Sequence, residues 1–303
     1  MSDARSNLVE ERSHDTAGQG AWPIVSDKHY DEQSVFQPEA LLREARRQRK
    51  LPLLAVPAVC VLDPDGDLVR HLKSTGRAEQ HAGWACYHTE LLTFDLASFG
   101  EVGIVGCAVG ASFAVLVTEQ LFASGCKLLV SVTSAGRISD RGPTPYFVLI
   151  DRALRDEGTS YHYLPPSEFS EAPDCMLVSL VEETASQLES IVLHRGATWT
   201  TDAPYRETAD AIEAARARDI LAVEMEAAAL YAFATAKQRS VVCFAHVTNA
   251  MAQTEGDFEK GDADGAMATL AVIGATIRAW SAEAKLNGPP DAGETTESAP
   301  VKR

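Results

Sequence analysis

Short apolar runs alternate with longer amphipathic segments over most of the chain. Buried strands are predicted at 55–62, 102–107, 127–132, 146–150, 191–200 and 240–247, and helices at 38–49, 112–123, 176–189, 207–218, 223–238 and 264–285. Strands that alternate with helices are typical of a mainly parallel, largely buried sheet with helices on both faces. The pattern therefore predicts one α/β domain.

The two ends of the chain lack this pattern. Residues 1–32 are polar and poor in aliphatic side chains, and residues 287–303 are rich in Gly, Pro, Glu and Thr. Segments of this composition bury too little apolar surface to fold. We therefore expect disordered tails at 1–32 and 287–303, and a folded domain at 33–286.

One edge of the predicted sheet is where a ligand is expected, because ligands of α/β sheets bind beyond the carboxyl ends of the strands. The loops at that edge are 63–67, 107–112, 133–137, 200–206 and 247–251, with 224–226 beside them at a predicted helix start. Polar side chains in these segments are the candidates for binding and catalysis.

The composition narrows the class of partner. The 303 residues carry a net charge of -16, which argues against nucleic acid or an anionic membrane surface as a partner. A small-molecule substrate stays open. No apolar run reaches the roughly 18 residues of a membrane helix, and the N-terminus has no signal core. We therefore expect a soluble, cytoplasmic protein.

The six cysteines do not indicate a metal site. They lie mostly inside apolar runs and show no C-x-x-C or Cys/His metal spacing (Cys60, Cys86, Cys107, Cys126, Cys175 and Cys243). Reduced core thiols are expected, as in a cytosolic protein. Neither a metal nor an organic cofactor is implied.

Two carboxylates, Glu224 and Glu226, flank Met225 at the start of an apolar, strongly helix-forming run. The helix dipole alone favours acids in a first turn. A polar loop at 199–208 lies upstream, however, and an apolar run downstream ends in polar residues at 246–249. This order resembles the nucleoside phosphorylase superfamily, which includes uridine phosphorylases, purine nucleoside phosphorylases and nucleosidases. The resemblance implies a single-domain, three-layer α/β/α fold with a mixed, mainly parallel central sheet.

The resemblance places a sugar at this acid pair. Departure of the base builds positive charge on the ribose, and a carboxylate that holds the ribose hydroxyls stabilises that charge. In the family the second Glu binds these hydroxyls and the Met packs on the sugar, which implies such roles for Glu226 and Met225, with Glu224 beside them. In the alternative interpretation both acids only begin a helix.

The segment 200–208 resembles the base-binding loop of the family, and Asp202 lies where the strand gives way to that loop. Tyr205 is either a base-stacking residue or a core tyrosine. Arg206 either donates to a base carbonyl or lies on the surface.

Asn249 stands where purine-specific relatives usually carry an Asp that protonates the leaving base. An amide cannot act as that acid, although it can bind a purine or pyrimidine edge. We interpret Asn249 as a base-recognition residue; the alternative is an ordinary Asn at a strand-end turn.

The phosphate pocket is where the sequence departs most from the family. Phosphorylases of the family use a Gly-Asp-Pro-x-Arg turn, a Gly-rich turn and an Arg before a Thr-x-Gly strand end, because phosphate needs charged donors and backbone N–H groups. Here Gly66 and Ser131 stand where the two arginines are expected. Gly110 of the Gly-rich turn and Ser134 of the strand end are retained.

Because these two cations are missing, the sequence does not decide whether phosphate or water accepts the sugar. Asp63 and Asp65 would repel phosphate, whereas an acid in their loop can activate water. His88, Arg137 or an arginine from another subunit could rebuild the phosphate pocket.

These features predict a nucleoside phosphorylase-like enzyme that cleaves the N-glycosidic bond of a purine or pyrimidine nucleoside, with phosphate as co-substrate. The alternatives are a hydrolytic nucleosidase and a catalytically weak nucleoside-binding protein. The family resemblance also implies a homo-oligomer, either a dimer or a hexamer.

Overall fold

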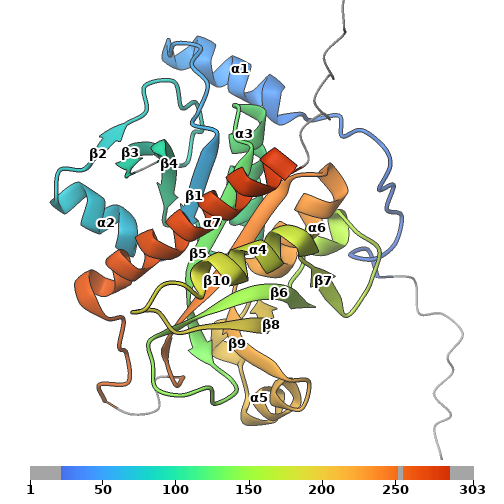
Figure 1. The fold of residues 1–303 in the computed structure, drawn as a ribbon. Coiled ribbons are helices and arrows are strands. Elements are labelled where there is room, and N and C mark those ends of the chain that lie inside the picture. Colours follow the sequence, from blue (N-terminus) through green and yellow to red (C-terminus); the bar gives the residue numbers. More distant parts are fainter. Residues whose placement is uncertain (1–21, 98, 252–254, 287–303) are drawn as a thin grey trace, which may run out of the picture.

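The computed structural model describes residues 22–97, 99–251 and 255–286 (Figure 1). Its strands are β1 (Val59–Asp63), β2 (Ala78–Gln80), β3 (Leu92–Leu96), β4 (Gly100–Gly106), β5 (Leu128–Arg137), β6 (Tyr146–Asp156), β7 (Phe169–Glu171), β8 (Leu193–Thr201), β9 (Ile220–Glu224) and β10 (Ser240–Asn249). Its α-helices are α1 (Pro38–Arg49), α2 (Asp67–Ser74), α3 (Ala111–Ala123), α4 (Cys175–Ala185), α5 (Ala209–Arg216), α6 (Ala227–Lys237) and α7 (Ala266–Leu286). Short 3-10 helices are η1 (Ser160–His162), η2 (Pro204–Arg206) and η3 (Asp262–Gly265).

The strands form one mixed sheet, part of which closes on itself. β10 pairs with β5 in parallel and with β6 in antiparallel orientation, and β6, β8 and β9 continue the path until β9 meets the end of β5. The first half of β5 pairs with β1 instead, and β4, β3 and β2 extend the sheet beyond β1. β9 runs antiparallel to β5, and the pairings of Gly136 with Val223 and with Asn249 bring the last residues of β5, β9 and β10 together.

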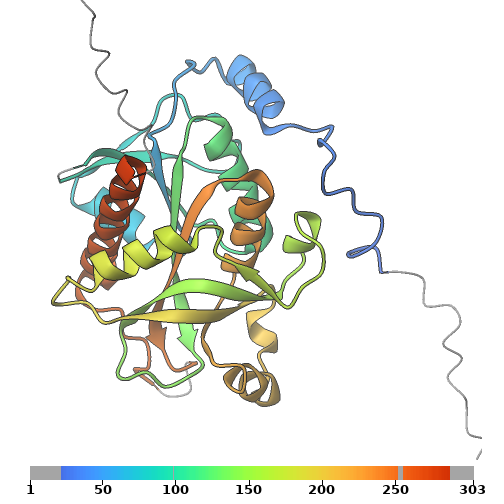
Figure 2. The same cartoon turned by 45° about the vertical axis from the view of Figure 1, so that its right-hand side comes forward.

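Helices cover both faces of the sheet, which confirms the predicted α/β layering (Figures 1 and 2). On one face, α3 and α6 pack together in a cluster of buried apolar side chains. On the other face, α2, α4 and α7 enclose a second apolar cluster. α6 is buried on all sides from Ala227 to Ala234, because small alanines let the helix approach its neighbours closely.

The predicted helix 223–238 begins later than expected. Residues 220–224 form strand β9, all of whose side chains are buried, and Glu226 is the N-cap of α6. The reason is tertiary: β9 fills the gap between β8 and the end of β5, and this pairing outweighs the helix propensity of the adjoining alanines. Glu224 therefore ends a strand, and Glu226 precedes a helix.

The N-terminal segment lies partly within the described residues. Residues 22–32 form turns, and the Lys28 Nζ lies 3.1 Å from His162 Nδ1 while the Tyr30 hydroxyl donates to the Tyr161 carbonyl over 3.4 Å. The remainder of the tails predicted at 1–32 and 287–303 falls outside the described residues. Among the helices in the described ranges, none is both long and apolar enough to cross a membrane.

Candidate active site

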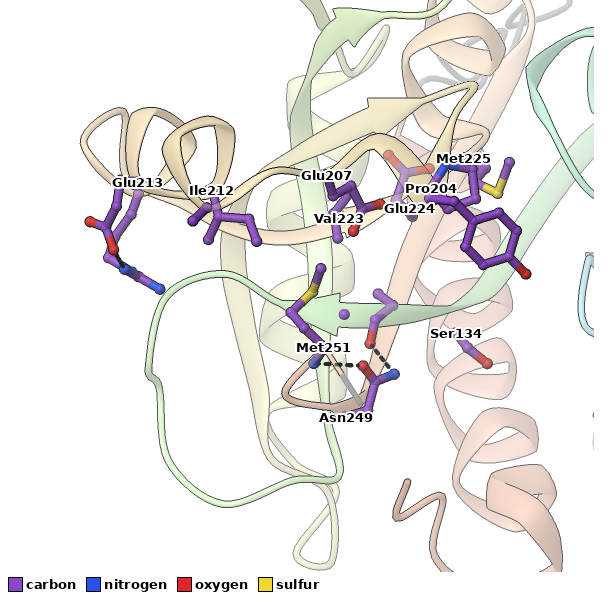
Figure 3. A pocket seen from close by; sticks show the side chains of 15 residues that line it. Ser134, Pro204, Glu207, Ile212, Glu213, Val223, Glu224, Met225, Asn249 and Met251 are labelled. Carbon is purple, nitrogen blue, oxygen red and sulfur yellow. Dashed lines mark hydrogen bonds and ion pairs between the residues drawn. The ribbon is translucent and has the colours of Figure 1, made fainter. Parts of the chain in front are cut away.

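A cavity of about 770 Å³ opens at the carboxyl ends of β5, β9 and β10, beside η2 and α5 (Figure 3). Its lining combines an apolar floor with a few polar groups (Ser134, Ala135, Gly136, Pro204, Tyr205, Glu207, Ala209, Ile212, Glu213, Arg216, Val223, Glu224, Met225, Asn249 and Met251). A volume of this order suits a small organic ligand. The cavity lies at the sheet edge where the sequence predicts a ligand.

Glu224 is a buried carboxylate whose hydrogen bonds are all made within the protein. Its Oε1 accepts from the hydroxyls of Thr198 (3.1 Å) and Thr200, and its Oε2 accepts from the backbone N–H groups of Glu226 and Ala227, both at 2.7 Å. Burial raises the pKa of Glu224, and these four donors offset part of that effect. Glu224 thus joins β8 to the start of α6.

Glu226 differs from Glu224 in having one oxygen without a partner. Its Oε1 accepts from the Gly110 N–H over 2.7 Å, whereas its Oε2 is buried and makes no hydrogen bond in the described part of the chain, although the nearby Thr133 hydroxyl acts to lower the pKa of Glu226. Burial, together with the charge of Glu224, raises the pKa of Glu226 to about 8. A buried oxygen without a donor is costly, so this atom points to a hydroxyl or amine supplied by a ligand.

Glu226 is buried and is not one of the residues that line the cavity, whereas its chain neighbours Glu224 and Met225 are. Gly110, the donor to Glu226 Oε1, is the N-cap of α3 and has φ +90°, a backbone conformation that favours glycine.

Asn249 enters the cavity from the end of β10. The pairing of β10 with β5 shifts register between Val247 and Asn249, and Asn249 lies opposite Gly136. Its Oδ1 accepts from the Met251 N–H over 2.9 Å, and its Nδ2 donates to the Ala135 carbonyl over 3.5 Å (Figure 3). The same Nδ2 also donates to the Thr248 hydroxyl over 3.2 Å. A β-bulge of this kind commonly redirects a side chain at a functional site.

Only part of the loop that is predicted to bind the base lines the cavity, and the other residues of the loop lie on the surface. Tyr205 lines the cavity and is fully exposed, which excludes the core interpretation. Arg206 is exposed and does not line the cavity. Asp202 is also exposed and accepts from the Gly158 N–H over 2.9 Å, away from the cavity lining.

Glu207 is a cavity residue that the sequence analysis missed. It is half-buried, and in the described residues it has neither a hydrogen bond nor an ion pair. Burial raises its pKa to about 7. Figure 3 shows Glu207 and Asn249 on opposite sides of the cavity. The sequence signal for Glu207 is an acid two residues after Tyr205, inside the segment 200–208 that resembles the base-binding loop.

A family model settles the relationship of this chain to known proteins. The model of the Phosphorylase superfamily matches residues 58–278. The chain belongs to the phosphorylase superfamily. Two solved structures of uridine phosphorylase from Vibrio fischeri ES114, one complexed with 6-hydroxy-1-naphthoic acid, match with TM-scores of 0.60 and 0.59. Each structure is 18% identical to this chain. Both matches cover 78% of this chain, and they cover 93% and 94% of the two uridine phosphorylase chains. At this identity the likeness shows the fold.

The two acids predicted near the superfamily's phosphate pocket, Asp63 and Asp65, line one small cavity together with Ser134 of β5. The Asp65 Oδ2 accepts from the Ser134 N–H over 2.6 Å, and the Asp63 Oδ2 accepts from the Val69 N–H over 2.8 Å. Burial raises the pKa of Asp63 to about 7, with smaller contributions from Asp65 and Asp67.

The two cations proposed to replace the superfamily arginines lie elsewhere. Arg137 is directed to the Gly142 carbonyl (3.2 Å) and to Asp140 (3.5 Å). His88 is exposed and makes an edge contact with Phe113. Neither side chain lines the cavity. In the described ranges, no group of three His, Cys, Asp or Glu residues is placed to hold a metal ion.

Proposed function

We propose that this chain cleaves the N-glycosidic bond of a purine or pyrimidine nucleoside at the cavity between β5, β9 and β10. The single observation that carries the proposal is the unpartnered, buried Oε2 of Glu226 beside that cavity. A ribose hydroxyl would satisfy this oxygen. Donation from that hydroxyl would lower the raised pKa of Glu226, so the group would ionise in the complex and stabilise the positive charge that the sugar develops as the base leaves.

The remaining lining fits the two halves of a nucleoside. Met225, which precedes Glu226 in the chain, and Ser134 line the part of the cavity where we place the sugar. The apolar Val223 and Met251, with the Asn249 amide, offer a surface for a planar base that carries polar edges. Met225 keeps the role that the superfamily resemblance gave it.

Glu207 supplies the proton that Asn249 cannot. With a pKa near 7, its carboxyl group is partly protonated at neutral pH and lies in the same cavity. General acids work best when their pKa is close to the working pH. We assign Glu207 the protonation of the departing base and Asn249 the recognition of its edge.

Phosphate is the sugar acceptor that superfamily membership suggests. A specific observation favours water as a second candidate: the Ser134 N–H, a donor that phosphate would use, is taken by Asp65. The reaction is therefore either phosphorolysis or hydrolysis of the same bond.

The test is the Glu226→Gln variant, assayed for release of base from a panel of nucleosides with and without phosphate. We expect a loss of about a hundredfold or more in kcat/KM, because the charge that stabilises the sugar cation is removed while its shape is kept. Glu213→Gln is the matched control, since Glu213 lines the same cavity but is paired with Arg216. Wild-type turnover in the Glu226 variant would contradict the proposal.

A further inference from the structure

The backbone donor at the end of β5 is occupied by the protein's own carboxylate. Asp65, in the turn after β1, reaches across to β5 and accepts from the Ser134 N–H over 2.6 Å. Ser134 lies within β5, near its carboxyl end, and a backbone N–H that is available there is a group that an anion would otherwise bind. The Asp65 side chain therefore occupies the position at the Ser134 N–H that a bound anion would take.

Neighbouring donors are also engaged within the protein. The Gly110 N–H is bound to Glu226, and the N–H groups of Cys107 and Gly66 both donate to the Asp63 carbonyl. Little space remains beside Gly66, because a Cβ there would lie 2.8 Å from the Cys107 Sγ and 3.0 Å from an Arg70 nitrogen.

The space next to Asp65 is both small and acidic. A cavity of about 20 Å³ is lined by Asp63, Asp65, Asp67 and Asp264, with His246. This volume holds about one water molecule and is too small for phosphate. The Nε2 of His246 is buried without a partner among the described residues, and burial lowers the His246 pKa to about 4, so the ring adds no positive charge at neutral pH.

The cations nearest to this acidic cavity are already paired. Lys260 Nζ lies 2.6 Å from the Asp67 carboxylate, and Arg70 binds the same carboxylate and the Asp65 carbonyl. A phosphate dianion arriving at Ser134 would therefore meet carboxylates where it needs charged donors.

From these contacts we infer that Asp65 acts as an internal anion that keeps phosphate out and makes water the sugar acceptor. The inference rests on the proposed glycosidic cleavage. In the reaction a C1′–O bond forms between water and the sugar, and the C1′–N bond breaks with its electron pair going to the base. One proton from the water ends on the base, so a nucleoside and water give a free sugar and a free base. Asp65 is a specificity-determining residue in this scheme.

The experiment titrates inorganic phosphate into the wild type, Asp65→Ala and Asp65→Asn by calorimetry. We expect wild-type binding only at millimolar concentration or above, and binding about ten to a hundredfold tighter in Asp65→Ala, which frees the Ser134 N–H and removes a like charge. Asp65→Asn should gain less, because its Oδ1 can still accept from Ser134. Asp264→Asn is the control, since it removes a charge from the same cavity without touching Ser134.

The sugar product of nucleoside turnover provides the second measurement. The wild type should release free sugar whether or not phosphate is present, and Asp65→Ala should form some sugar 1-phosphate in its presence. Micromolar phosphate binding by the wild type, or equal isotherms for the wild type and Asp65→Ala, would overturn the inference. If no variant cleaves any nucleoside, the proposed function fails, but the isotherms still decide the role of Asp65. Should Asp65→Ala fail to fold, the isotherm of Asp65→Asn decides.

Discussion

Two glutamates separated by one residue have opposite roles in this fold because their hydrogen bonds differ. Glu224 accepts four hydrogen bonds and links two strands to a helix, whereas Glu226 keeps one buried oxygen free. A saturated carboxylate has nothing to offer a ligand, and an unsaturated one needs a donor. The free oxygen of Glu226 therefore supports the proposal that this residue, and not Glu224, binds the ligand.

At the scale of a single side chain, Glu207 can be tested by its effect on bases that differ in their need for a proton. We expect Glu207→Gln to lower kcat for purine nucleosides by about ten to a hundredfold and to remove a pKa near 7 from the pH profile of kcat. Rates should be measured from pH 5 to pH 9 in both proteins. An unchanged profile would show that the proton comes from another group.

Residue chemistry was also the part of the site that the sequence predicted best. Asn249 and Ser134 follow predicted strands, whereas Glu226 and Met225 stand at a predicted helix start that resembles the superfamily. Met225, Asn249 and Ser134 line one cavity, and Glu226 adjoins Met225 in the chain. The bond between Asp65 and Ser134 was out of reach, because it joins residues 69 positions apart and depends on how β1 and β5 pair. The residues that surround Asp65 and Ser134 in the sequence do not indicate that the two lie close together in the fold.

At the scale of elements, the start of α6 depends on Glu224. β9 was missed in the sequence because Ile220 to Val223 runs directly into an alanine-rich segment, and nothing local separates strand from helix there. In the folded protein the Glu224 carboxylate satisfies two backbone N–H groups at that junction and two threonine hydroxyls on β8. The boundary is therefore set by a side chain that reaches across strands.

Replacing Glu224 should consequently weaken the fold. We expect Glu224→Ala to lower the free energy of unfolding by roughly 3 to 5 kcal/mol, because four buried donors lose their acceptor. Chemical denaturation followed by circular dichroism measures this change. Glu213→Ala, on the exposed side of the same cavity, should cost less than about 0.5 kcal/mol. Equal losses in the two variants would argue against the bridging role of Glu224.

At the scale of the whole molecule, the site makes the stability of the fold depend on pH, because its buried carboxyl groups have raised pKa values. Burial raises the pKa of Asp63 from 3.8 to about 7 and that of Glu226 from 4.5 to about 8. Between the unfolded and folded values, the folded protein keeps protons that the unfolded chain has released. Raising the pH through this window therefore favours unfolding.

The free energy of unfolding should therefore decrease as the pH rises, and this decrease can be measured. The free energy of unfolding of the wild type should fall as the pH rises from about 4.5 to 8, and the double variant Asp63→Asn with Glu226→Gln should be less sensitive to pH. Each substitution removes up to one proton from the difference between the two states, a change in slope of about 1.4 kcal/mol per pH unit. Denaturant unfolding at pH 5, 6, 7 and 8 gives these slopes, with Asp95→Asn as a control outside the site. Parallel curves for the double variant and the wild type would show that neither carboxyl group keeps its proton in the folded protein, and Glu226 would then be charged before any nucleoside binds.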